Sequence, residues 1–108
     1  KEKRLLSTVE VTIFRLIQEA INNARKHADP NRILVRLEFT ENQINMQVED
    51  DGVGFDVEDA RQRAKYGSHY GLMSMGERVD LLGGDLKILS ARGEGTTVVA
   101  SIPINSGE

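Results

Sequence analysis

Apolar residues recur at helical spacing near the start of the chain. The Ser7-Thr8-Val9-Glu10 segment has the Ser-x-x-Glu form of a capping box, so a helix is predicted to begin there. Asp29-Pro30 predicts its end, because a proline disfavours helical backbone in the residue before it. The apolar stripe predicts that this helix packs by one face; it consists of Val9, Ile13, Leu16, Ile17, Ala20, Ala24 and Ala28.

Apolar and polar residues alternate in the next part of the chain. Ile33, Val35, Leu37 and Phe39 are separated by single polar or outward residues, which predicts a strand with one buried face. The alternation resumes at Ile44, Met46 and Val48 after a turn over residues 41–43. Together these segments predict a β-hairpin that leads directly into Asp50 and the glycines after it.

The second half of the chain repeats this order. Leu72, Met75, Val79 and Leu82 mark a second long helix, which Gly83-Gly84 is expected to end. Strands are predicted over residues 85–91 and 96–102, joined by a glycine-containing turn. Residues 56–70 are polar, and we expect 65–70 to be mobile. Helix, hairpin, helix, hairpin predicts an α+β fold with the helices on one face of a sheet.

Composition limits the classes of function. The 108 residues suffice for one domain with a core of its own. The net charge of -3 excludes the basic surface that nucleic acid would need, and the absence of cysteine excludes disulfides and thiol chemistry. No apolar run approaches the roughly 20 residues that span a bilayer. Because the chain opens within a charged stretch and lacks an initiator methionine, we expect residues 1–108 to be one domain of a longer protein.

Four polar residues on the first predicted helix are candidates for binding and catalysis. Glu19 and Asn23 lie one turn apart, and Lys26 and His27 follow within the next turn, so all four can lie on one side. The amide oxygen of Asn23 suits Mg²⁺, Lys26 suits phosphates, and Glu19 suits the orientation or deprotonation of an attacking group. The alternative interpretation is a solvated helix edge, with His27 packed as an ordinary hydrogen-bonded histidine.

The Asp50-Asp51-Gly52-Val53-Gly54-Phe55 segment comes directly after a strand. Gly52 and Gly54 allow the backbone to turn sharply and to lie close to a flat ligand. The carboxylate of Asp50 can accept a hydrogen bond from an exocyclic amine such as that of adenine, whereas a guanine carbonyl would be rejected. A plain Asp-Gly turn is the alternative. A calcium loop is excluded because its later oxygen ligands and closing glutamate are missing.

Gly71 is predicted to precede the second long helix. A glycine there lets phosphates approach free backbone N–H groups and the positive end of the helix dipole. An ordinary loop glycine is the alternative. The chain has no Walker-type phosphate-binding loop and no Gly-x-Gly-x-x-Gly in a parallel unit. Any nucleotide site must therefore combine the three separated segments.

In this order and at this spacing, the segments resemble a known family. Gln18–Ala28, Asp50–Phe55, Gly71-Leu72 with Glu77-Arg78, and Gly93–Thr96 resemble the N, G1, G2 and G3 boxes of the gyrase/Hsp90/histidine-kinase/MutL ATPase superfamily. The residues of these motifs are most similar to those of the ATP-binding catalytic domain of sensor histidine kinases of the nitrate-sensor, DegS and DesK type. The resemblance covers nearly the whole chain, from about Val9 to Pro103.

The resemblance implies a Bergerat-type two-layer α/β sandwich, with a mixed, mostly antiparallel sheet and ATP bound beneath a lid over residues 56–70. It implies Asn23 as the Mg²⁺ ligand, Asp50 as the residue that reads adenine, and Glu19 as the acidic residue beside the metal, with Lys26 shared between catalysis and phosphate binding. The remaining ATP-binding residues implied are His27, Gly52, Gly54, His69, Tyr70, Gly71, Leu72 and Thr96.

The family also implies what the parent protein does. We expect this domain to transfer the γ-phosphoryl of Mg-ATP to a histidine on a separate dimerisation domain of the same parent, which serves a response regulator. We expect the acceptor histidine to lie outside this chain, since His27 belongs to the N box and His69 lies in the predicted lid just before Gly71. We expect a monomeric isolated domain, a homodimeric parent and a cytoplasmic location, with the parent either cytosolic or in the inner membrane. The alternatives are an anti-sigma-factor-type serine kinase and a non-catalytic ATP-sensing module.

Overall fold

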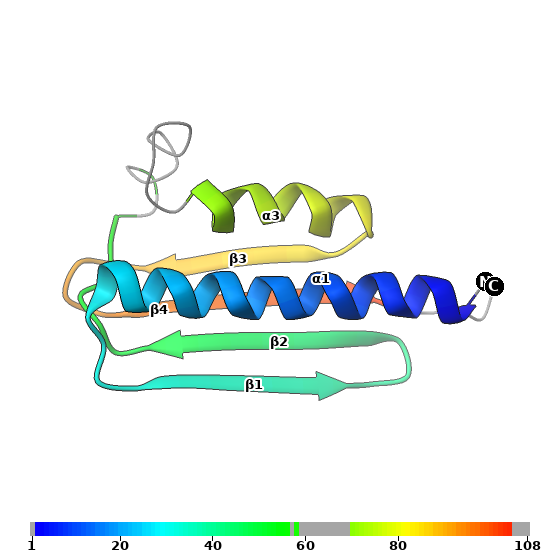
Figure 1. The fold of residues 1–108 in the computed structure, drawn as a ribbon, viewed down its shortest axis with the longest axis horizontal. Helices are drawn as coiled ribbons and strands as arrows, with labels where there is room; N and C mark the ends of the chain where they lie inside the picture. The colour runs from blue at the N-terminus through cyan, green and yellow to red at the C-terminus, as the bar shows by residue number, and fades with distance from the viewer. Residues whose placement is uncertain (1, 57, 59–69, 105–108) are drawn as a thin grey trace.

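The computed structural model describes residues 2–56, 58 and 70–104, with the backbone alone described for 2–6, 27–28 and 70–73. Its elements follow the predicted order of helix, hairpin, helix, hairpin (Figure 1). They are α1 (Glu2–Asn23), η1 (Ala24–Ala28), β1 (Ile33–Phe39), β2 (Gln43–Asp50), α3 (Tyr70–Leu81), β3 (Asp85–Ser90) and β4 (Thr96–Pro103).

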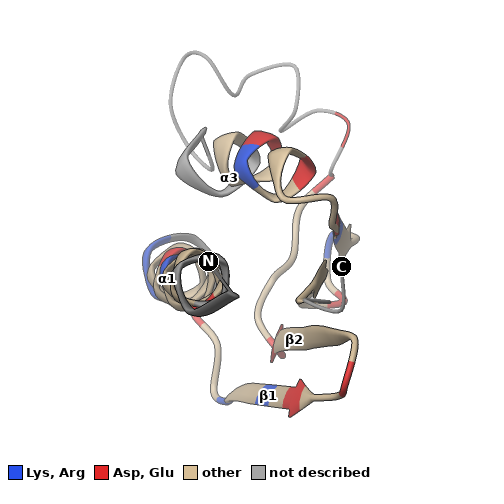
Figure 2. Ribbon diagram, turned by 90° about the vertical axis from the view of Figure 1, so that its right-hand side faces the viewer, with Lys and Arg blue, Asp and Glu red and all other residues tan. Residues whose placement is uncertain are grey.

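The strands form one four-stranded sheet in the order β1-β2-β4-β3, and each neighbouring pair is antiparallel. The two hairpins thus meet along β2 and β4, and α3 makes the connection between them. Both helices lie on the same side of the sheet (Figure 2). The predicted α+β class, with helices on one face, is confirmed.

The core lies between α1, α3 and the helix-facing side of the sheet. Leu16 of α1, Met46 of β2 and Ile102 of β4 are almost fully enclosed. Each such side chain contributes about 1.5–3 kcal/mol when it leaves water, so this layer holds the two hairpins and the helices together. The buried apolar residues of this core are Val9, Ile13, Leu16, Ala20, Ile44, Met46, Val48, Met75, Val79, Val98, Ala100 and Ile102.

The start of α1 differs from the prediction. The capping box at Ser7–Glu10 predicted a helix start there, but the helix begins at Glu2. Lys3, Arg4, Leu5 and Leu6 are all strong helix formers and carry the helix upstream. Ser7 and Glu10 are therefore exposed positions within the helix, and their spacing was not a cap.

The end of this helix is confirmed at Asp29-Pro30, but its last turn has an unpredicted form. Residues Ala24–Ala28 are π-helical, and Asp29 follows with left-handed backbone at φ 47° and ψ 55°. Aspartate tolerates that conformation better than most residues. The π turn therefore sits in the segment that carries Lys26 and His27.

β1 has the predicted bounds but not the predicted buried face. Only Ile33 is half-buried, and Phe39 is 58% exposed. The alternation is real, since Val35 and Leu37 pair with the buried Val48 and Met46 of β2 and share their side of the sheet. However, α1 packs on β2 and β4, and no other described element covers β1. The prediction of a buried face was wrong because periodicity shows which residues share a face, not whether that face is covered.

The carboxylate of Asp51 fastens the connection between η1 and β1 to the end of β2. Its Oδ1 accepts hydrogen bonds from the backbone N–H groups of Asn31 and Arg32, both at 2.9 Å. These bonds lower the pKa of Asp51 below its ordinary value, and the bond from the backbone of Arg32 has the largest effect. The segment that links α1 to the sheet is thereby held beside Asp50.

We expect Asp51→Asn to lower stability at neutral pH and to flatten its dependence on acid. A carboxyl group whose pKa is depressed by folding stabilises the folded state above its unfolded pKa, and that contribution is lost as pH falls through the folded value. The parent should therefore lose stability below about pH 4, and the variant should lose less. Urea unfolding from pH 7 to pH 3 measures this, with the exposed Asp85 substituted by asparagine as the control. Identical slopes for Asp51→Asn and the parent would contradict the role.

Candidate functional site

The candidate site residues of the described chain gather at one end of the molecule. The carboxyl-terminal end of α1, the end of β2, the start of α3 and the start of β4 all lie at the left in Figure 1. The polypeptide therefore brings the three separated sequence segments to the same end of the sheet. This is the arrangement that a nucleotide site built from all three requires.

Asp50 and Thr96 form a buried polar pair at this end of the sheet. They lie opposite each other in the register of β2 and β4, so their side chains share the helix-facing side. Asp50 is 9% exposed and Thr96 is 8% exposed. The Oδ1 atom of Asp50 accepts the backbone N–H of Gly52 at 2.8 Å, which fixes the orientation of the carboxylate.

Glycine backbone lies against this pair. Gly95, at φ +76°, has no room for a side chain, because a Cβ atom would overlap the carbonyl oxygen of Asp50. Gly54, at φ +68°, is packed in the same way against the carbonyl of Ala91. The turn after β2 and the turn before β4 are therefore in close backbone contact, whereas the predicted approach of Gly54 to a flat ligand stays a prediction.

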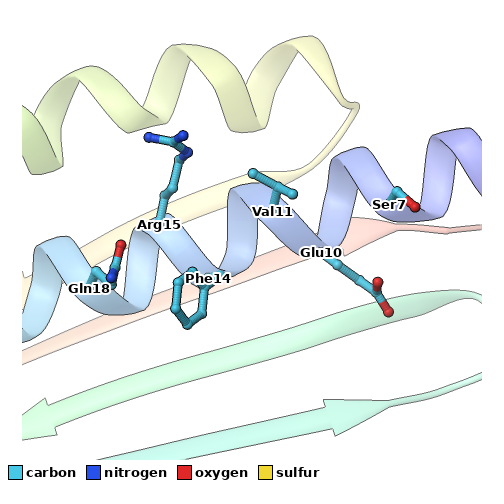
Figure 3. Close-up of a pocket in the computed structure, with 6 residues that line it drawn as sticks. All are labelled: Ser7, Glu10, Val11, Phe14, Arg15 and Gln18. Carbon is cyan, nitrogen blue, oxygen red and sulfur yellow. The ribbon is translucent and has the colours of Figure 1, made fainter.

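Glu19 and Asn23 lie on the flank of α1 that faces α3. Arg15, one turn before Glu19, points toward α3 (Figure 3), and α1 and α3 are in contact. Both Glu19 and Asn23 are half-buried, whereas Lys26 is exposed in the π turn. The structure thus places Glu19 and Asn23 on the side of α1 toward α3, and their roles in binding and catalysis stay predictions.

The side-chain amide of Asn23 is half-buried and is not fully hydrogen-bonded within the described structure. Its Nδ2 atom is buried and has no hydrogen-bond partner within the described structure. Leaving a buried amide nitrogen unpaired costs about 1–3 kcal/mol. A side-chain amide carries an oxygen acceptor as well as its nitrogen, and an amide oxygen suits a hard cation such as Mg²⁺.

Comparison with known proteins decides the family. Residues 8–106 match the family described as histidine kinase-, DNA gyrase B- and HSP90-like ATPase. The chain belongs to this family. It is a histidine kinase-like ATPase domain, so it is of a kind that binds ATP.

Relatives place the domain among histidine kinases. It is 39% identical over 105 residues to the signal transduction histidine-protein kinase/phosphatase DegS of Bacillus subtilis, covering 97% of this chain and 27% of that protein. It is 40% identical over 104 residues to an uncharacterized sensor-like histidine kinase of Chloroflexus aurantiacus, covering 95% and 17%. The chain therefore spans about a quarter or less of these relatives. The predicted resemblance to the DegS type is confirmed.

A solved structure gives the same family. The histidine kinase domain of a blue-light activated histidine kinase from Erythrobacter litoralis is 28% identical to this chain, with a TM-score of 0.67. The match covers 90% of this chain and 45% of that one. The predicted histidine-kinase fold of the ATPase domain is thereby confirmed.

Several predicted site residues of the ATPase domain fall outside what the structure describes. His69 and nearly all of the predicted lid over residues 56–70 are outside the described residues, and the side chains of His27, Tyr70 and Leu72 are too. The backbone places Tyr70, Gly71 and Leu72 in the first turn of α3, which begins at Tyr70. Gly71 thus lies within the start of the helix and not before it.

One polar residue of the ATPase domain's site was missed by the sequence reasoning. The hydroxyl oxygen of Ser90 lies 2.8 Å from that of Thr96 and 2.9 Å from the backbone nitrogen of Phe55. The signal was present, because Leu86, Ile88 and Ser90 alternate along β3 and share one face. A serine at the end of an apolar face, two residues from a turn, could have been chosen as a candidate.

A shallow hollow on the outer side of α1 is separate from this site. Its lining comes entirely from one helix, on the side turned away from the sheet (Figure 3), and two of its members, Val11 and Phe14, are more than half exposed. The lining residues are Ser7, Glu10, Val11, Phe14, Arg15 and Gln18. Apart from Gln18, at the edge of the first box, none of these residues belongs to the ATP boxes.

Among the described residues, no helix has the length and apolar character that crossing a membrane requires.

Proposed function

We propose that this domain binds Mg-ATP and donates its γ-phosphoryl group to a histidine on a separate helical domain of a sensor histidine kinase. The observation that carries the proposal is the buried Asp50–Thr96 pair beside the α1 flank that bears Glu19 and Asn23. A buried carboxylate at a sheet end, facing a helix that offers an amide and a second carboxylate, separates a base-binding end from a phosphate-binding end. Membership of the ATPase family supports the same division.

Asp50 would bind the base. One of its carboxylate oxygens is held by the N–H of Gly52, and the carboxylate as a whole accepts but does not donate. An exocyclic amine satisfies this acceptor, whereas a carbonyl leaves it unpaired. The buried position makes an unpaired acceptor costly, so Asp50 would favour adenine over guanine.

Asn23 would hold the metal ion. It is half-buried at the carboxyl-terminal end of α1, and an amide oxygen is a ligand that Mg²⁺ accepts. Within the described residues, no three acidic or histidine side chains gather into a metal site. The other ligands would therefore be phosphate oxygens and water, as is usual for Mg²⁺. When bound, the ion neutralises phosphate charge.

Transfer would depend mainly on positioning. A bond forms between an imidazole nitrogen of the acceptor histidine and the γ-phosphorus, and the bond from that phosphorus to the β,γ-bridging oxygen breaks, so ADP leaves. Glu19, half-buried on the α3-facing flank, orients the imidazole and receives its proton. The exposed Lys26 and the side chain of His27 bind phosphate oxygens. Gly71, in the first turn of α3, lets phosphates approach free N–H groups.

The partners follow from this role. The acceptor is a dimeric helical domain of the same parent, so the parent is a homodimer, and a response regulator receives the phosphoryl group from that acceptor. The isolated ATPase domain acts as a monomer on the cytoplasmic side. Each of these expectations concerns a protein longer than this chain.

The chain alone should bind Mg-ATP and fail to label itself, yet label the parent's helical domain supplied in trans. Transfer requires a nucleophile held about 3–3.5 Å from the γ-phosphorus, and neither His27 nor His69 is proposed to act as one. Labelling in trans should be slow, because the tether that raises the effective concentration is absent. Radiolabelled ATP, followed by acid and base treatment of the products, identifies the phosphorylated residue.

The outcomes of this assay distinguish the candidate functions. Acid-labile, base-stable label on the helical domain supports the histidine kinase. Acid-stable phosphoserine on a partner would replace it with an anti-sigma-factor-type serine kinase. Binding of Mg-ATP without transfer to any partner would point to an ATP-sensing module instead.

Asn23→Ala should remove most of the Mg²⁺-dependent part of ATP affinity and leave the domain folded. Alanine is the best helix former, and the substitution also deletes an unpaired buried nitrogen, so stability should not fall. Asn22→Ala is the matched control, since Asn22 is the exposed neighbour on the same helix. Calorimetric titration with and without Mg²⁺ measures the effect. If ATP affinity depended on Mg²⁺ equally in both variants, the assignment of the Mg²⁺ ion to Asn23 would be contradicted.

A further inference from the structure

Three polar side chains form a row across the sheet at the nucleotide end. Ser90 of β3 lies opposite Thr96 of β4, which lies opposite Asp50 of β2. Paired residues share a side of the sheet, so all three side chains are on the helix-facing side. The next row inward, formed by Ile88, Val98 and Val48, is apolar. Polar side chains on the core side of a sheet are stable only when their hydrogen bonds are satisfied, so the partners of this row must be identified.

Ser90 joins three groups through a single hydroxyl. Its oxygen lies 2.9 Å from the backbone nitrogen of Phe55, 2.9 Å from the carbonyl oxygen of Gly95 and 2.8 Å from the hydroxyl oxygen of Thr96. A hydroxyl has one proton to donate and two lone pairs with which to accept. The three contacts therefore use the whole hydrogen-bonding capacity of the serine.

The proton positions follow from this count. A carbonyl oxygen can only accept, so the proton of Ser90 must go to Gly95. The backbone N–H of Phe55 can only donate, so it takes one lone pair of Ser90. The contact with Thr96 is then satisfied in one way, with the threonine hydroxyl as the donor. Thr96 is left with lone pairs and no proton for anything else.

The side of Thr96 that faces the nucleotide site is therefore an acceptor. Asp50, its neighbour in the row, is also an acceptor, and one of its oxygens is already held by Gly52. Two acceptors side by side favour a ligand group that carries two N–H donors. The exocyclic amine of adenine has two, whereas inosine and guanine carry a carbonyl at the same position.

We propose that Ser90 is a positioning residue for base specificity: by holding the proton of Thr96, it keeps the base pocket free of donors, so that a 6-amino purine is accepted and a 6-oxo purine is rejected. Ser90 acts through Thr96 and does not touch the base itself. The inference rests on the proposed binding of ATP at Asp50. It adds β3 to the elements that determine which nucleotide is bound.

The test is a double-mutant cycle on nucleotide selectivity. ATP and inosine triphosphate differ in the group at position 6 of the purine. The dissociation constant of inosine triphosphate divided by that of ATP therefore measures the discrimination at this position. Ser90→Ala should lower this ratio about tenfold, the size of one hydrogen bond, because Thr96 is then free to donate to a carbonyl. Thr96→Val removes the hydroxyl, and in that background Ser90→Ala should leave the ratio unchanged. Calorimetric titration gives all four ratios.

A purely structural serine would behave differently. Ser90→Ala would then weaken both nucleotides equally, or would change the ratio by the same factor with and without the Thr96 hydroxyl, and either result overturns the inference. Ser90→Thr retains the hydroxyl and should retain the selectivity. If Ser90→Ala does not fold, Thr96→Val alone still decides, because an unchanged ratio in that variant shows that the hydroxyl does not discriminate. Failure of the parent chain to bind ATP would instead overturn the proposed function.

Discussion

Gly95→Ala is expected to destabilise the domain by roughly 2–5 kcal/mol, the sum of a left-handed backbone penalty and forced overpacking. Gly95 has φ +76°, and an added Cβ atom would overlap the carbonyl oxygen of Asp50. That carbonyl belongs to the paired backbone of β2 and cannot move without disturbing the ladder to β4. Urea unfolding measures the loss of free energy of unfolding.

Gly93→Ala is the matched control for this change. Gly93 also has a left-handed backbone, at φ +85°, but nothing lies within 4 Å of the position of an added Cβ atom. It should cost only the backbone penalty, about 1–2 kcal/mol. Equal destabilisation by the two substitutions would mean that the contact with Asp50 does not limit the packing of the turn.

Asp50→Asn is expected to weaken ATP binding by about 1.5–3 kcal/mol, the range for a hydrogen bond to a charged group. This corresponds to a rise in the dissociation constant of roughly 10- to 150-fold. Asparagine has the same shape and keeps an oxygen for the N–H of Gly52, so the turn after β2 should persist. Calorimetric titration measures the affinity, and the parent chain should also prefer ATP strongly over GTP.

Asp51→Asn serves as the control for the neighbouring aspartate. The Oδ1 atom of Asp51 is occupied by the backbone of Asn31 and Arg32, so this substitution should alter stability more than nucleotide affinity. If both variants weakened ATP equally, the loss would reflect a general disturbance of the loop. Equal binding of ATP and GTP by the parent would contradict the assignment of the base to Asp50.

The elements of the fold were predictable because their apolar periods are clear. Ile44, Met46 and Val48 alternate, and all three are buried on the side facing the helices, as the pattern predicted. The π turn of η1 and the uncovered face of β1 were not predictable in this way. Both depend on how elements pack against one another, and a period of two or 3.6 residues does not contain that information.

The candidate site was predictable where the family boxes fix a residue type at a fixed place. Asp50 and Thr96, both assigned to ATP binding by the resemblance, lie opposite each other at one sheet end, and Gly54 packs against the adjoining turn. Their contacts with ATP stay predictions. Ser90 was missed because its role depends on three partners from different parts of the chain, namely Phe55, Gly95 and Thr96. The spacing of residues within one segment of the sequence cannot predict a contact between several segments.

Because α1 ends in a π turn, the direction of the last side chains of the helix depends on the number of residues in that turn. A π turn holds more residues than an α turn of similar rise, and such turns are found as local bulges within α-helices. Ala24–Ala28 can therefore be regarded as a helical end with one residue to spare. Deleting a residue there would return the turn to α geometry and rotate the remaining residues of the helix by about 100° around its axis. In engineering terms, the segment is a place where a deletion re-aims Lys26 without breaking the helix.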